Sequence, residues 1–390
     1  MPFPSIPYWR LSAFYFAYLG ALGAFSPYFA PYLETRGLSA FEISVVMSLW
    51  YATRIYAPSL WGSLSARANS PIRWLRAGAL ATLIGFALFL LPLGYAGVLV
   101  VMTLFASFYN AIMPQFEAIT FARLGAQRSL YGRIRVWGSV GFVLANVGYG
   151  ALLQWLGYGW LIWALIPVYA LLVYSSWQNS DPPQPLAAEP APGFRDTVMP
   201  RLRERALWGL LLAAFANQIA HGPFYVFFSL YLSRNHYQAQ QIGGYWAVGV
   251  LAEILMFLLV PRLLRWLTPR QVIALSFAIG ALRWTATATL PHMAPVLVLA
   301  QCGHAFTFAA LHSASMQSIS QLFPGRSGVH GQGLIYGFSS GGGGVIGALM
   351  AGALWEFGGG RASFLGAALV SLAGLVIAWK LLPREQTASA

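Results

Sequence analysis

Residues 96–122 read AGVLVVMTLFASFYNAIMPQFEAITFA, an apolar run that contains a single ionisable side chain, Glu117. A helix needs about 20 apolar residues to cross the hydrocarbon of a bilayer, so this run predicts a membrane-spanning helix. A charge near the bilayer centre costs roughly 2.5–3.5 kcal/mol on insertion scales, and such residues mark substrate or ion pathways. Glu117 is therefore a candidate functional residue.

The rest of the chain repeats this pattern, since 58% of its 390 residues are hydrophobic and only 8% are charged. Strands of alternating polarity, typical of membrane β-barrels, are absent from the sequence. We predict an all-α membrane protein with twelve transmembrane helices. The predicted spans are 8–33, 42–64, 74–93, 96–122, 132–156, 159–177, 206–232, 242–263, 272–290, 295–322, 332–355 and 361–382.

The basic residues between these spans predict the orientation of the chain. One side keeps only Arg36, Arg234 and Arg361. The opposite side holds Arg67, Arg73, Arg76, Arg123, Arg128, Arg133, Arg195, Arg201, Arg203, Arg205, Arg262, Arg265, Arg270, Arg326, Lys380 and Arg384. By the positive-inside rule this second side and both termini are cytoplasmic, and we expect the bacterial inner membrane. The start, Met1 to Arg10, lacks a small-residue cleavage site, and the apolar run beyond it is too long for a signal-peptide core, so we expect it to remain as helix 1.

The polar stretch 178–205 predicts a cytoplasmic linker between two six-helix bundles, 1–177 and 206–390. Sliding the second half back by 199 residues superimposes several letters of the two halves. Such duplicated halves are typical of secondary transporters with a site between the repeats. We expect the lipid bilayer as the surroundings, a small-molecule substrate and protons as partners, and a functional monomer.

Several classes of protein are excluded or disfavoured by missing residues. Lys380 is the only lysine and follows no glycine-rich loop, so the chain has no Walker A motif. Cys302 is the only cysteine, and no aspartate lies in a span, so we expect no cofactor, no metal and no enzyme activity. The arginines are dispersed singly rather than gathered on one face, which argues against nucleic acid as a partner.

Five ionisable residues interrupt the apolar spans: Glu117, Arg135, Glu253, Arg283 and Arg54. Glu117 and Arg135 are equidistant from the loop between their helices, so antiparallel packing places them at equal depth, where they can pair. Glu253 and Arg283 are related in the same way. Inert ion pairs between neighbouring helices are the alternative, because buried pairs often add little net stability.

Polar and aromatic residues share helix faces with these charges. Candidate substrate contacts are Asn110 near Glu117, Phe142 near Arg135, and the pair Asn217 and His221. His304 and His312 lie two turns apart, and either is a candidate proton relay or a hydrogen-bonded packing residue.

The string Tyr131–Ser139, YGRIRVWGS, together with Glu117 and the twelve-helix repeat, resembles the major facilitator superfamily. The resemblance is greatest to the phenylpropionate permease and nucleoside symporter-like group related to lactose permease. It implies that Glu117 and Arg135 bind substrate. It also implies that Glu253, Arg283 and His312 couple protons.

Three departures from the family pattern limit this resemblance. Ala66 stands where the loop after the second span usually has an acidic residue, so gating through that loop is in doubt. Phe142 matches a tryptophan that stacks on galactosides, and Ser315 follows His312 where a glutamate is expected. The excess of buried arginine over glutamate favours an anion. We therefore predict a proton-coupled symporter of a small organic solute, with an aromatic carboxylate favoured. Uptake of a sugar or nucleoside, drug efflux and a membrane-embedded enzyme remain as alternatives.

Overall fold

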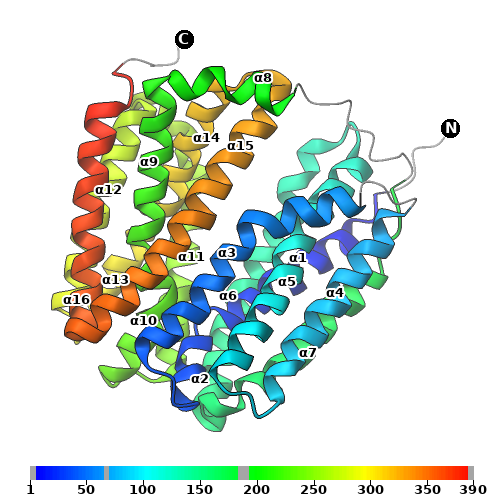
Figure 1. The fold of residues 1–390 in the computed structure, drawn as a ribbon, viewed down its shortest axis with the longest axis vertical. Helices are drawn as coiled ribbons and strands as arrows, with labels where there is room; N and C mark the ends of the chain where they lie inside the picture. Colours follow the sequence, from blue (N-terminus) through cyan, green and yellow to red (C-terminus); the bar gives the residue numbers. More distant parts are fainter. Residues whose placement is uncertain (1–5, 66–69, 183–192, 385–390) are drawn as a thin grey trace. The chain divides into compact units, whose positions relative to one another are not determined.

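The computed structural model describes residues 6–65, 70–182 and 193–384, and these residues form helices and short connections without a strand (Figure 1). They divide into two compact units. Unit 1 comprises the described residues of 6–38, 52–182 and 238–243. Unit 2 comprises 39–51, 193–237 and 244–384. The predicted bundle boundaries remain a prediction, and residues 183–192 of the predicted linker lie outside the described residues, as do Ala66 and Arg67.

Unit 1 is built from long helices joined by short turns. Its helices are α1 (Tyr8–Phe25), α2 (Phe29–Thr35), the second part of α3 (Ala40–Ser65), α4 (Pro71–Ala87) with the turn η1 (Leu88–Leu90), α5 (Tyr95–Leu124), η2 (Arg128–Leu130), α6 (Tyr131–Leu156), η3 (Tyr158–Trp160) and α7 (Leu161–Trp177).

Unit 2 contains the first part of α3 and the remaining helices, except that residues 239–243 of α11 belong to unit 1. Two of its helical stretches include π-helical segments. The remaining helices are α8 (Phe194–Val198), η4 (Pro200–Arg203), α9 (Arg205–Ala220), α10 (Gly222–Arg234), α11 (Ala239–Trp266), α12 (Pro269–Thr289), α13 (Ala294–Cys302), the π-helix η5 (Ala305–Ala310), α14 (Leu311–Leu322), η6 (Gly325–Ser327), α15 (Gly328–Ile335), the π-helix η7 (Tyr336–Gly343) and α16 (Gly344–Leu381).

Nine helical stretches of the described chain are long and apolar enough to cross a membrane. The last of them, 328–381, covers two predicted spans, which are separated by non-helical backbone at Gly358 and Gly359. The two predicted spans outside these nine fall on α1 with α2, and on α3. The helices are therefore consistent with twelve spans. The turn at Ser26–Tyr28 in the first span is a detail that the sequence did not predict.

Two helix starts at equivalent places in the two units use the same residue types. Ser70 precedes Pro71 at the start of α4, and Thr268 precedes Pro269 at the start of α12. Proline fits the first helical position because the N–H it lacks has no partner there. Thr268 forms a capping box with Gln271, whereas Ser70 caps no N–H of its own helix. The two starts are 198 residues apart, close to the offset of the sequence repeat.

Glycines allow close helix contact at equivalent places in both units. A Cβ at Gly23 of α1 would lie 2.5 Å from the carbonyl oxygen of Phe142 on α6. A Cβ at Gly222 of α10 would lie 2.2 Å from the carbonyl oxygen of Gly347 on α16. Gly23 and Gly222 are 199 residues apart, which is the offset of the repeat. Small residues of this kind let membrane helices pack backbone to backbone.

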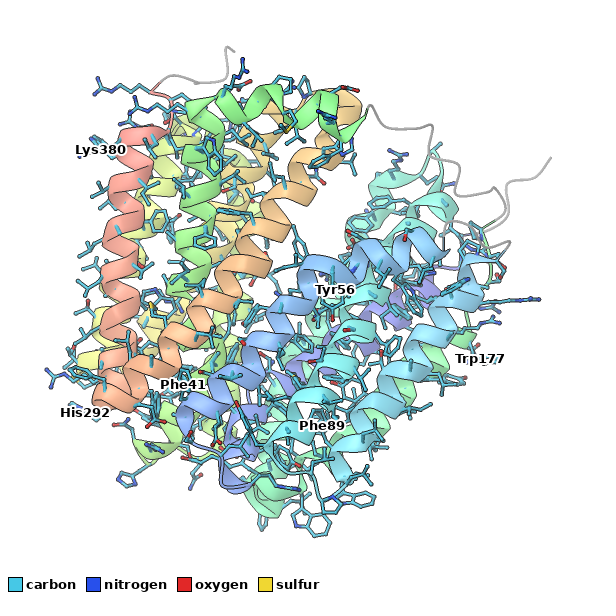
Figure 2. The ribbon with its side chains drawn as sticks, in the orientation of Figure 1. Phe41, Tyr56, Phe89, Trp177, His292 and Lys380 are labelled. Atoms are coloured by element: carbon cyan, nitrogen blue, oxygen red, sulfur yellow. The ribbon has the colours of Figure 1, made fainter. Side chains whose placement is uncertain are left out.

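In each unit, an arginine on an earlier helix contacts a tryptophan near the end of the last helix. Arg76 of α4 stacks on the ring of Trp177, 4.9 Å from its centroid, and Arg270 of α12 stacks on Trp379 at 4.6 Å. Each guanidinium also donates to the carbonyl of the same tryptophan. Figure 2 labels Trp177 at the end of α7 and Lys380 at the end of α16. The same Arg–Trp contact therefore occurs in both units.

We predict that Gly23→Ala destabilises the protein by about 1–3 kcal/mol, because the added methyl group overlaps the backbone of α6. Gly148→Ala is the matched control. It adds a methyl group to α6 where nothing lies within 4 Å, and there it should be neutral or stabilising. Unfolding of the detergent-purified proteins measures both effects. Equal unfolding temperatures for Gly23→Ala and the native protein would contradict this packing.

Candidate functional site

Arg283 of α12 is the centre of a buried polar cluster in unit 2. Only 3% of its surface is exposed. Its Nη1 donates to Oγ1 of Thr307 at 2.6 Å and lies 3.1 Å from Nδ1 of His304. A guanidinium has only donors, so Nδ1 of His304 accepts this hydrogen bond. His304 is therefore a neutral imidazole with its proton on Nε2.

Glu253 of α11 lies on the other side of His304, with 3.7 Å between Oε2 and the Nε2 of His304. The sequence suggested a direct pair between Glu253 and Arg283. In the structure the imidazole of His304 stands between them and contacts both. The Glu253 side chain is 21% exposed, so it is the more accessible end of this row of three groups.

Asn217 and His221 extend the same cluster towards α9 and α10. The Nδ1 of His221 donates to the Asn217 carbonyl at 2.7 Å, and Nε2 lies 3.2 Å from Oγ1 of Thr307. The side-chain amide of Asn217 donates to the Thr307 carbonyl at 3.1 Å. Thr307 thus joins two predicted substrate residues to the predicted coupling residues.

The π-helix η5 sets the geometry of this region. It begins directly after His304 and contains Thr307. The rings of His304 and Phe308 stack at 5.4 Å, and those of Phe308 and His312 at 6.3 Å. His304 and His312 therefore share a face, as predicted from their spacing, but only His304 contacts Arg283. Local π-helical turns occur often at functional sites.

One edge of the Arg283 guanidinium has no protein partner. Its Nε and Nη2 are buried and make no hydrogen bond, although Nη1 makes two. These two N–H groups point the same way and match the spacing of two carboxylate oxygens. Aromatic rings cover the guanidinium, with its carbon 3.9 Å from the centroid of Trp284 and 5.2 Å from that of Phe224. Gln301, fully buried nearby on α13, also has both polar side-chain atoms unpaired.

Unit 1 contains the second group of predicted residues, around two tyrosines. Glu117 of α5 accepts a hydrogen bond of 3.0 Å from the Tyr131 hydroxyl. Arg135 of α6 lies over the ring of Tyr15, 5.5 Å from its centroid, and the rings of Tyr15 and Tyr131 are 6.4 Å apart. Within the described residues, Glu117 and Arg135 form no ion pair within 4.0 Å, unlike the direct pair that the sequence suggested. Both residues contact this tyrosine pair instead.

The other predicted residues of unit 1 lie on three helices. Asn110 of α5 is buried and donates to Oγ1 of Thr53 on α3 at 2.9 Å. Arg54 follows Thr53 and is half-buried. The backbone of Phe142 packs against Gly23, and its side chain is half-buried.

Sequence reasoning missed three residues of these clusters, Thr307, Gln301 and Tyr131. Hydroxyl and amide side chains are common in membrane helices, so a lone threonine or glutamine gave no signal. The position of Thr307, three residues after His304, could have identified it. In the part of the chain that the structure describes, no three His, Cys, Asp or Glu residues gather as a metal site would require.

Comparison with known proteins gives a family and several relatives. Residues 8–366 match the MFS_1 like family. A protein of Escherichia coli (strain K12), named as a probable 3-phenylpropionic acid transporter, is 27% identical over 376 residues and matches 95% of this chain and 96% of its own length. A maltose permease of Geobacillus stearothermophilus is 27% identical over 383 residues, with 96% and 94% covered.

Solved structures share the fold at low sequence identity. The crystal structure of the nucleoside transporter NupG superimposes with a TM-score of 0.80 at 16% identity, covering 96% of this chain and 98% of that one. An inward-facing bacterial homologue of the human lysosomal transporter Spinster gives a TM-score of 0.72 at 14% identity, covering 96% of each chain. The helices of this chain thus follow the fold of these transporters.

We predict that Thr307→Val destabilises the protein by about 1–3 kcal/mol, because it leaves buried groups of Arg283 and His221 without a partner at nearly constant volume. Thr285→Val is the control, since the exposed hydroxyl of Thr285 bonds only to its own helix. Chemical unfolding in detergent measures the difference. If the two variants unfold alike, Thr307 does not hold the cluster together.

Proposed function

We propose that this chain, which belongs to the MFS_1 like family of the major facilitator superfamily, is a proton-coupled symporter of a small aromatic carboxylate. It is an integral membrane protein, and its family and relatives are transporters rather than enzymes. We further propose that it acts as a monomer in the bacterial inner membrane, with both termini in the cytoplasm.

The observation that carries the proposal is the free edge of Arg283. Burying two N–H donors of a cation without acceptors is costly, and a bound carboxylate removes this cost with two charge-assisted hydrogen bonds. The flanking rings of Phe224 and Trp284 give an aryl group apolar contact. The name of the Escherichia coli relative, a probable 3-phenylpropionic acid transporter, supports this class of substrate.

The row Glu253, His304, Arg283 supplies a means of coupling the anion to a proton. While Arg283 donates to Nδ1 of His304, the imidazole stays neutral, because a second proton would displace that hydrogen bond. A carboxylate on the free edge of Arg283 offsets the positive charge beside His304. Protonation of His304 at Nδ1, which Arg283 then releases, becomes easier, and the Glu253 carboxylate beside Nε2 stabilises the imidazolium. Each ligand therefore increases the affinity for the other, and this mutual effect is the linkage that symport requires.

In unit 1, we propose that Glu117 and Arg135 bind the substrate. The hydrogen bond from Tyr131 orients the Glu117 carboxylate. Asn110, Phe142 and Arg54 stay predictions as further contacts.

Sugar uptake is the second candidate, because the maltose permease relative matches this chain at the same identity as the first. A sugar has no charge to place on Arg283, so it would depend on neutral hydrogen bonds. Nucleoside uptake rests on likeness of fold alone, and drug efflux has no supporting contact in the described clusters.

We predict that 3-phenylpropionate competes for transport at least about tenfold better than 3-phenylpropionamide, because the amide keeps the ring and loses charge-assisted hydrogen bonds. Uptake by membrane vesicles, with each compound as competitor, measures the ratio. Arg283→Lys keeps the charge but not the planar edge, and in this variant the advantage of the acid should shrink. Equal competition by acid and amide, or competition by maltose alone, would contradict the proposed substrate class.

We predict that Glu253→Gln abolishes accumulation driven by a pH gradient and leaves substrate exchange largely intact. The amide still faces Nε2 of His304 but has no negative charge to stabilise the imidazolium. Accumulation and exchange are measured in the same vesicles, and Glu204→Gln, at an exposed position, is the control. Uphill accumulation by Glu253→Gln would assign the proton to another residue.

A further inference from the structure

A polar pocket of about 340 Å³ lies in unit 1, at the ends of three helices. It is lined by Pro7, Arg10, Arg123, Gln178, Asn179 and Ser180. These residues come from the start of α1, the end of α5 and the segment after α7. The proposed transport mechanism uses none of them.

Arg123 lines the pocket, and part of its guanidinium makes no hydrogen bond. Its Nη2 donates to the carbonyls of Ser180, at 3.0 Å, and of Asp181, at 2.6 Å, and to the Ser180 hydroxyl. Its Nε is buried and has no hydrogen-bond partner. The guanidinium is thus fixed by the segment after α7 while one N–H remains unused.

Arg10 supplies a second guanidinium to the same pocket. The buried side chain of Asn179 donates to the Arg10 carbonyl at 3.1 Å and thereby fixes the backbone of Arg10 beside the segment that Arg123 holds. Among the described residues, the Arg10 side chain forms no ion pair or hydrogen bond, and it is exposed. Two like charges therefore share one pocket.

The neighbouring carboxylate does not fill this pocket. Asp181 directs its carboxylate to the start of α4, where Oδ2 accepts from the Ser70 hydroxyl at 2.6 Å and Oδ1 accepts from the Ile72 N–H at 2.9 Å. Asp181 is also absent from the pocket lining. The two arginines thus lack a full counter-charge within the part of unit 1 that is described.

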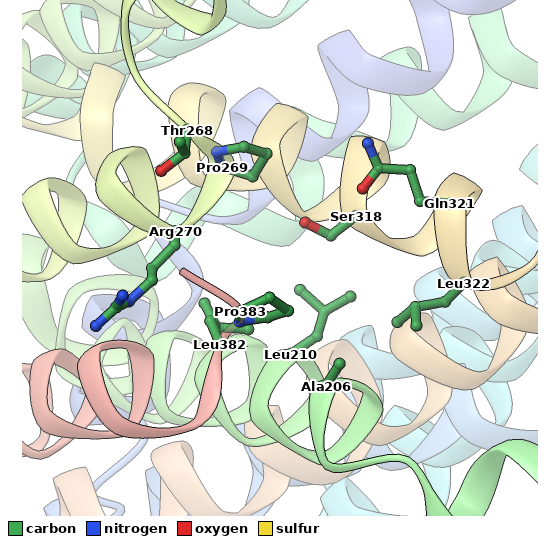
Figure 3. A pocket seen from close by; sticks show the side chains of 10 residues that line it. All are labelled: Ala206, Leu210, Thr268, Pro269, Arg270, Ser318, Gln321, Leu322, Leu382 and Pro383. Carbon is green, nitrogen blue, oxygen red and sulfur yellow. The ribbon is translucent and has the colours of Figure 1, made fainter. Parts of the chain in front are cut away.

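Unit 2 has a pocket at the equivalent place, and its composition is different. It measures about 110 Å³ and is lined by Ala206, Leu210, Thr268, Pro269, Arg270, Ser318, Gln321, Leu322, Leu382 and Pro383 (Figure 3). The repeat offset of 199 carries Pro7 to Ala206, Arg10 to Gly209 and Arg123 to Leu322. Figure 3 shows the Arg270 guanidinium pointing away from Leu210 and Leu322. Unit 2 therefore forms a pocket at this place without arginines at the positions of Arg10 and Arg123. The two arginines of unit 1 are thus not needed to form the pocket, and we look for a role in binding.

We propose that the pocket of unit 1 binds a phosphate-bearing anion between Arg10 and Arg123. Exposed tryptophans lie on the bounding helices, with Trp9 68% and Trp177 58% exposed, and tryptophan is typical of the membrane–water interface. Basic pockets between helices at this level bind anionic lipid head groups. The phosphate belongs either to such a head group or to a free ion, and the chemistry of recognition is the same.

The test uses the full-length protein, purified in an uncharged detergent and stripped of lipid. Thermal unfolding is followed while short-chain phosphatidylglycerol, inorganic phosphate or short-chain phosphatidylcholine is added, with sodium chloride at matched ionic strength as the blank. We expect stabilisation that saturates with phosphatidylglycerol or with phosphate. Arg10→Gln should raise the half-saturating concentration about tenfold, as expected on losing one charge-assisted contact.

The variants and probes separate the outcomes. Arg265→Gln removes an exposed arginine outside the pocket and should bind like the native protein. Saturation by phosphate alone identifies a free anion, whereas saturation only by phosphatidylglycerol identifies a lipid head group. If Arg10→Gln binds like the native protein, or if phosphatidylcholine stabilises as well as phosphatidylglycerol does, the pocket is not an anion site.

Discussion

A cation inside an apolar helical unit must have its donors satisfied by the chain itself or by what the chain binds, because hydrocarbon offers no acceptor. Arg283 shows both cases on one group. Its Nη1 is satisfied by His304 and Thr307, while Nε and Nη2 are not satisfied by any protein atom. In the proposed function, an anion completes the hydrogen bonds of this unsatisfied half, and the satisfied half connects the guanidinium to His304 and, through it, to Glu253.

The sequence predicted the helical class, the location of the spans and the residues that carry charge, because apolar length and intramembrane charge are properties of single segments. It did not predict how the charges meet. Glu253 and Arg283 have the right depth to pair, but His304 lies between them, which depends on the π-helix that begins after it. Likewise, Tyr131 hydrogen-bonds to Glu117 in place of an arginine. Such details depend on how each helix is rotated about its axis and on which neighbouring side chain is close enough to bond to the charged group. The sequence pattern contains neither kind of information.

The arginines used to predict orientation also have a local structural role. Arg76, Arg201, Arg205 and Arg270 each donate to a carbonyl at or just beyond a helix C-terminus. Those carbonyls have no partner within the helix and carry partial negative charge, which a guanidinium offsets. Within each unit, these arginines therefore stabilise helix termini, in addition to the part in topology that the sequence predicts for them.

The cap at the start of α4 has a consequence for how the protein is made. The Ile72 N–H is satisfied by Asp181, 109 residues further along the chain. A ribosome makes α4 well before it makes Asp181. The Ile72 N–H therefore cannot donate to Asp181 until α7 and the residues after it have been synthesised. The contact between the start of α4 and the segment after α7 is therefore completed only once that segment has been made.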